Sequence, residues 1–136
     1  MGISNSPELH MLFWAIGLGI VQLLVAVLAS VGRRGLPWAA GPRDEPGAPL
    51  GLFGGRLERA YRNFLETFPF FAAAVLLAHA LDRSNHNSVL GAQMYVWARL
   101  LYIPAYVFAI PFLRTLIWVA GLAGILMVMS AIWQGI

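Results

Sequence analysis

Four long apolar stretches dominate the chain, and they are separated by polar segments or by segments rich in glycine and proline. A helix needs about 20 apolar residues, at about 1.5 Å each, to cross roughly 30 Å of hydrocarbon. The pattern therefore predicts four transmembrane helices, over residues 9–31, 57–81, 89–110 and 113–133. We expect an all-α membrane protein with a single domain over residues 1–136, a four-helix transmembrane bundle.

The connections support antiparallel neighbours. Residues 32–55 combine glycines, prolines and mixed charges, a composition typical of a loop. Residues 82–87 form a short polar turn, and Pro111 favours a tight third turn because the residue before a proline avoids the helical region.

Composition excludes a soluble domain. Of the 136 residues, 60% are hydrophobic and 11% charged, whereas a soluble domain carries about 25% charged residues. Ten of the fifteen charged residues lie between Arg33 and Glu66, and all nine basic residues are arginine. Arginines so few and so local do not suit a nucleic-acid surface, and we predict no nucleic-acid partner.

The chain contains no cysteine, which excludes disulfides, thiolate metal sites and a thiol nucleophile of its own. Any thiol chemistry must use a thiol that the ligand brings. We predict no metal site. His79, His86 and Asp82 lie around a polar turn, where such residues are common without binding a metal. The apolar run behind the uncharged residues 1–7 is too long for a signal peptide and predicts a retained span.

The distribution of arginines along the chain predicts its orientation in the membrane. Most arginines fall in the first connection and the start of the second span, Arg114 follows the third turn, and Arg83 stands alone on the opposite side. The positive-inside rule places the first loop and the third turn in the cytoplasm and both termini outside.

One face of the second predicted helix carries Arg59, Asn63 and Glu66, which lie within about 60° of one another, with Arg56 and Arg62 on its flanks. Charged groups at membrane depth are expensive and usually face a bundle interior or a cavity. The alternative is an interfacial helix on which Arg62 and Glu66 form an i, i+4 pair.

The third predicted span carries a matching face of Arg99, Tyr102 and Tyr106. An arginine in a span calls for a carboxylate, and Glu66 is the candidate. Several arginines and one glutamate suit a ligand with two carboxylates and one ammonium, which is the charge pattern of glutathione. A nearby arginine would also favour the thiolate of that ligand. An amino-acid transporter would show similar charges, but no inverted repeat is present.

The segment from Arg59 to Glu66, followed by Phe68-Pro69-Phe70-Phe71, resembles the Arg-Ala-x-x-Asn-x-x-Glu signature of the MAPEG family, the membrane-associated proteins in eicosanoid and glutathione metabolism. The third span, Arg99-x-x-Tyr102-x-x-x-Tyr106, and the later Ile110-Pro111-x-x-Arg114 extend the resemblance over nearly the whole chain. The chain looks most like the bacterial members, which implies a multi-pass protein of a bacterial inner membrane.

This resemblance implies a homotrimer with glutathione as co-substrate, bound between neighbouring subunits near the cytoplasmic side. By position, Arg114 would stabilise the thiolate, and the arginine pair Arg33 and Arg34 would reach the glutathione carboxylate or the second substrate. Arg99, Tyr102 and Tyr106 would line the pocket of the adjacent subunit. The implied glutathione-binding residues are Arg33, Arg56, Arg59, Asn63, Glu66, Arg99, Tyr102 and Tyr106, and the implied catalytic residues are Arg114 and Arg34.

Three functional hypotheses follow. The first is a membrane glutathione transferase or peroxidase, acting in detoxification, that conjugates the glutathione thiolate to an apolar small molecule or lipid. The second is a non-catalytic lipid-binding or scaffold protein of the same fold, as in the lipoxygenase-activating branch of the family. The third is a structural bundle whose charges have no ligand.

Overall fold

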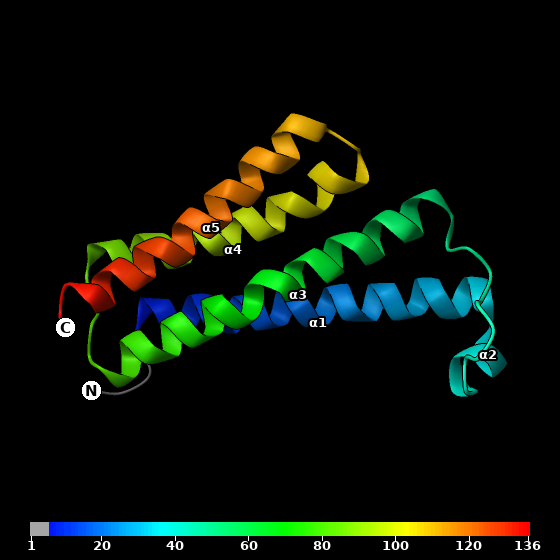
Figure 1. The fold of residues 1–136 in the computed structure, drawn as a ribbon, viewed down its shortest axis with the longest axis horizontal. Coiled ribbons are helices and arrows are strands. Elements are labelled where there is room, and N and C mark those ends of the chain that lie inside the picture. The colour runs from blue at the N-terminus through cyan, green and yellow to red at the C-terminus, as the bar shows by residue number, and fades with distance from the viewer. Residues whose placement is uncertain (1–5) are drawn as a thin grey trace.

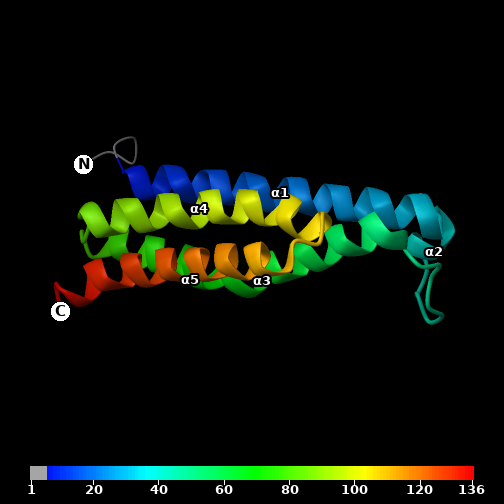
Figure 2. The ribbon, with the colours of Figure 1, turned by 90° about the horizontal axis from the view of Figure 1, so that it is seen from above.

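A computed structural model describes residues 6–136 as helices and their connections. The helices are α1 (Pro7–Arg34), α2 (Leu36–Ala40), α3 (Gly51–Ala80), α4 (His86–Val107) and α5 (Pro111–Trp133). The four long helices lie side by side and alternate in direction, so the first and last described residues are at the same end (Figures 1 and 2). The prediction of an all-helical bundle is confirmed.

The first connection differs from the predicted loop. It contains the short helix α2, and α3 begins at Gly51, six residues before the predicted start at residue 57. Gly35 takes a φ of 86°, which permits the chain to turn between α1 and α2, and a proline follows in the first turn of α2, where its missing N–H costs nothing.

Helix α4 ends earlier than predicted, at Val107 and not at residue 110. Ala109 adopts a φ of 55°, which stops the helix, and Pro111 then starts α5. The hairpin turn is therefore short and tight, as the position of Pro111 predicted.

Among the described residues, three helices are long and apolar enough to cross a membrane, namely α1, α3 and α5. Helix α4, the third predicted span, is not one of them because Arg99 and several other polar residues lower its hydropathy. Its 22 residues extend about 33 Å and lie along α5, so it is long enough to accompany α5 across a bilayer. That α4 is a fourth span stays a prediction.

Helices α4 and α5 form the most extensive helix pair of the bundle, because two glycines let their backbones approach closely. A Cβ added at Gly91 would lie 2.7 Å from the Cβ of Met127, and one added at Gly124 would lie 2.5 Å from the Gly91 carbonyl oxygen. The α4–α5 hairpin is therefore a closely packed unit.

The hydrophobic core occupies the half of the bundle that holds the chain ends. It is formed by the start of α1 and α4 and the end of α3 and α5, and includes Phe71, Val75, Tyr95 and Val128. At the same end, the buried carboxylate of Glu8 joins α1 to the α3–α4 turn.

Glu8 is 3% exposed and accepts hydrogen bonds from serine hydroxyls. Ser84 donates to it at 2.6 Å, and the fully buried Ser88 also donates to it. Ser88 in turn forms a capping box with Asn85 at the start of α4. These contacts close the bundle at this end.

The opposite end is more open and carries most of the arginines. There α1 and α3 project beyond the α4–α5 turn (Figures 1 and 2), and Figure 1 shows the hairpin diverging from α1. The polar residues predicted to form a site lie on the helix faces at this end.

Candidate functional site

A polar cavity of about 340 Å³ lies between α3, α4 and α5 in the more open half of the bundle. It is lined by Asn63, Tyr102, Tyr106, Arg114, Thr115 and Trp118. Four of these residues were predicted as site residues from the sequence. The structure thus brings together residues from three helices that are up to 55 positions apart in the chain.

Arg99 lies directly behind this cavity and is only 2% exposed. Its Nη1 donates to the Asn63 side-chain oxygen at 2.9 Å, and its guanidinium lies over the Tyr102 ring at 4.2 Å from the centroid. The buried Nε has no hydrogen-bond partner. The cation is therefore held in position but only partly satisfied.

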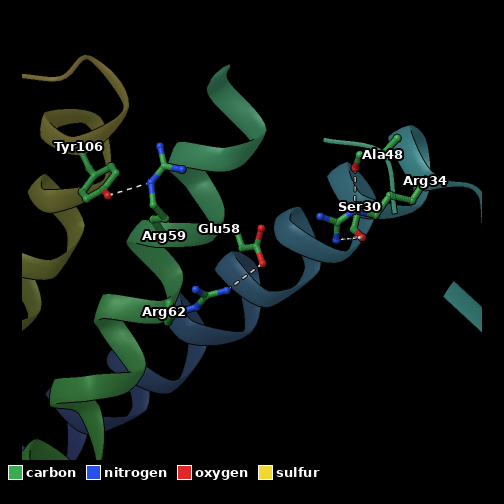
Figure 3. Close-up of polar contacts among 7 residues, drawn as sticks. All are labelled: Ser30, Arg34, Ala48, Glu58, Arg59, Arg62 and Tyr106. Carbon is green, nitrogen blue, oxygen red and sulfur yellow. Dashed lines mark hydrogen bonds and ion pairs between the residues drawn. The ribbon is translucent and has the colours of Figure 1, made fainter. Parts of the chain in front are cut away.

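The expected ion pair between Arg99 and Glu66 is not formed. Within residues 6–136, the ion pair present joins Arg62 to Glu58 at 3.2 Å, and Glu66 is exposed on α3. The alternative pairing of Arg62 with Glu66 is therefore also wrong, because Arg62 turns back toward the preceding helical turn (Figure 3). An amide, and not a carboxylate, meets the buried cation.

Tyr106 lies between two arginines at the edge of the cavity. Arg59 Nε donates to its hydroxyl oxygen at 3.1 Å (Figure 3), and the Arg114 guanidinium lies over the ring at 4.9 Å from the centroid. The positive charges of α3 and α5 therefore converge on a tyrosine of α4. Such a cluster favours an anionic group in the cavity.

These contacts form within a single chain. Arg99 and Tyr106 reach α3 of their own subunit, and that they also line the pocket of an adjacent subunit stays a prediction. Within the bundle, the i, i+3, i+7 face of α4 is turned toward the Asn63 face of α3.

Arg56 has a different partner from the one expected. Its Nη1 donates to the backbone carbonyl oxygen of Val107 at 2.8 Å, and it does not line the cavity. The predicted glutathione contact of Arg56 therefore stays untested, and the structure assigns its guanidinium to the end of α4.

Arg34 and Arg33 lie away from the cavity of their own chain. Arg34 Nε donates to the Ala48 carbonyl at 2.9 Å, and its guanidinium lies 4.9 Å from the centroid of Trp38. Figure 3 shows Arg34 directed at the first connection, apart from Arg59 and Tyr106. Within one subunit, the end of α1 supplies nothing to this site.

Sequence reasoning missed two lining residues, Thr115 and Trp118. A signal was present, because Thr115 follows Arg114 directly and Trp118 lies one helical turn beyond it. That spacing identifies Thr115 and Trp118 as lining residues only once Arg114 is known to face the bundle interior.

The long apolar helices are those of an integral membrane protein, and a buried arginine lies beside a polar cavity between its helices. A family model, described as MAPEG family, matches residues 11–133. The chain therefore belongs to the MAPEG family. No match was found among curated proteins or among solved structures.

Proposed function

We propose that the protein is a membrane-bound glutathione transferase, with peroxidase-type chemistry on suitable substrates, that binds glutathione in the cavity between α3, α4 and α5. The observation that carries this proposal is the buried Arg99. A guanidinium at membrane depth costs several kcal/mol, and the contacts of Arg99 with Asn63 and Tyr102 offset that cost but leave the charge without an anion. An anionic tripeptide would supply that anion, and the family supplies the precedent for glutathione.

In the proposed complex, the polar groups of α3 and α4 bind the tripeptide. Arg59 and Arg99 meet its carboxylates, the Asn63 amide and the tyrosine hydroxyls donate or accept hydrogen bonds, and Glu66 meets the ammonium group. Arg114 lies near enough to Tyr106 to stabilise a thiolate placed against that ring.

The reaction is then a nucleophilic displacement. The glutathione thiol loses its proton to solvent, the thiolate sulfur forms a bond to the electrophilic carbon, and the leaving group departs with its electron pair. The protein contributes position and electrostatic stabilisation of the thiolate. The indole of Trp118 provides an apolar wall for the electrophile.

We also propose that the active form is a homotrimer. Glu66 is exposed in the middle of α3, and an exposed carboxylate facing lipid is expensive. A neighbouring subunit that covers this face would remove the cost. The neighbouring subunit would also bring its Arg33 and Arg34, at the end of its α1, to the cavity of the first subunit. The first subunit's own Arg33 and Arg34 do not reach that cavity.

The first test uses the purified protein in detergent or nanodiscs with glutathione and chlorodinitrobenzene. We expect the ultraviolet absorbance of a thiolate on glutathione binding, and turnover of the dinitrobenzene substrate. Titration calorimetry should show that Arg59→Ala and Glu66→Ala lose glutathione binding. Arg62→Ala, which removes an arginine of the same helix that pairs only with Glu58, is the matched control and should keep binding.

Binding without thiolate formation or turnover would favour the non-catalytic lipid-binding or scaffold alternative. An intact trimer that binds no glutathione would refute the proposed function.

A further inference from the structure

The end of α4 is completed by a side chain from another helix. The last four carbonyls of an α-helix have no partner inside the helix. In α4 the turn satisfies three of them: Phe108 N–H donates to Pro104, Ala109 N–H to Tyr106, and Ile110 N–H to Ala105. The carbonyl of Val107, the last helical residue, accepts from Arg56 at 2.8 Å.

The sequence explains why the backbone does not satisfy this carbonyl. In a continuing helix, its donor would be the N–H of residue 111, and residue 111 is a proline, which has none. A carbonyl left unpaired near the hydrocarbon boundary costs free energy. The guanidinium supplies the missing donor and places a positive charge at the negative end of the helix dipole.

The last turn of α4 also needs this support. Pro104 lies inside the helix, so the hydrogen bond that its N–H would make to the Leu100 carbonyl is absent. The two prolines therefore remove a backbone hydrogen bond at each end of the segment from Pro104 to Pro111, at the carbonyls of Leu100 and Val107. This is the segment that carries Tyr106, which lines the cavity and meets Arg59 and Arg114.

We propose that Arg56 is a positioning residue that clamps the end of α4 to α3 and thereby fixes Tyr106 at the cavity. Its bond joins residues 51 positions apart and ends on the backbone, so it fixes the helix itself. Arg56 then acts on the ligand through Tyr106, without a contact of its own. The effect on glutathione affinity rests on the proposed function, whereas the clamp does not.

Because the chain has no cysteine, single cysteines can be introduced and labelled cleanly. Phe53, near the start of α3, and Phe112, near the start of α5, are 57% and 84% exposed and suit spin labels. The distance between the two labels is measured in the full-length protein, with labelled chains diluted in unlabelled ones. The variants are Arg56→Ala and Arg56→Gln, so that the test does not depend on one variant folding.

Arg62→Ala is the matched control, because it removes the same charge from the same helix but breaks only an exposed bond to Glu58. We expect Arg56→Ala and Arg56→Gln to lengthen and broaden the label distance, and Arg62→Ala to leave it unchanged. Glutathione Kd should rise roughly tenfold in the Arg56 variants. Ligand binding must then restore the order that the hydrogen bond from the Arg56 guanidinium to Val107 supplies in the wild type.

The outcomes separate the two proposals. If the label distance broadens in the Arg56 variants and the wild type binds no glutathione, the clamp is supported and the proposed function is refuted. An unchanged distance with weakened glutathione binding refutes the clamp and makes Arg56 a direct ligand contact. An unchanged distance with unchanged binding also refutes the clamp.

Discussion

Replacing Arg99 by methionine should leave the free protein stable and abolish its response to glutathione. Placing an arginine at the centre of a membrane helix costs about 2.5–3.5 kcal/mol on the insertion scale. The hydrogen bond to Asn63 returns about 1.5–3 kcal/mol, and the contact with the Tyr102 ring about 0.5–2 kcal/mol. Because these contributions nearly cancel, the methionine variant without ligand should lie within about 1 kcal/mol of the wild type.

Glutathione should stabilise the wild type against unfolding and have no such effect on Arg99→Met. At 100 times its Kd, a ligand that binds only the folded state stabilises it by about 2.7 kcal/mol. The wild type should gain this amount, whereas Arg99→Met should gain nothing, because the cation that the ligand compensates is absent. Arg62→Met is the control and should gain as much as the wild type.

The assay is thermal or detergent-induced unfolding of the purified protein, followed with and without glutathione. A methionine variant that loses about 3 kcal/mol or more without ligand would mean that the contacts of Arg99 stabilise the free protein well beyond the cost of burying its charge. A variant that keeps the full glutathione response would mean that the ligand binds elsewhere. Either result would refute the reasoning.

Three further predictions concern packing and specificity. Gly91→Ala should destabilise the protein by about 1–3 kcal/mol in a thermal unfolding assay, because its Cβ would meet the backbone of α5, whereas Gly17→Ala, with nothing within 4 Å, should be neutral or stabilising. Tyr95→Phe should cost about 0.5–1.5 kcal/mol, because the buried Thr67 hydroxyl loses its 2.9 Å partner but still donates to the Phe64 carbonyl at 3.3 Å, and a double-mutant cycle with Thr67→Val should measure the coupling of the two side chains. Trp118→Ala should raise KM for chlorodinitrobenzene several-fold in steady-state kinetics and leave the Kd for glutathione unchanged, and equal effects on both would contradict its assignment to the electrophile.

The sequence was sufficient for the four long helices and for four of the six residues that line the cavity. Apolar runs of membrane length and helical spacing placed Asn63, Tyr102 and Tyr106 on inward faces, and the cavity confirms those faces. Such patterns are local, since a helix imposes the same angular step on every residue.

The partners of the arginines could not be predicted in the same way. Arg99 was expected to meet Glu66 and instead meets Asn63, one helical turn away, because the relative height of two helices depends on packing along their whole length. The acceptor of Arg56 is a backbone carbonyl, which sequence pattern does not mark. The clusters around Arg34 and Trp38 arise from the folding of a connection whose composition indicated only a loop.

The separation of the hydrophobic core from the cavity determines how substitutions in the two regions affect stability and ligand binding. In many enzymes, substitutions that improve a binding site cost stability, because the two properties depend on the same residues. Here the packed core and the Glu8 contacts occupy one end of the bundle, and the cavity occupies the other. Under the proposed function, substitutions around Trp118 would change which substrates fit, while stabilising substitutions around Phe71 and Val128 would offset their cost without contacting the cavity. The fold is in this sense a favourable starting point for laboratory evolution.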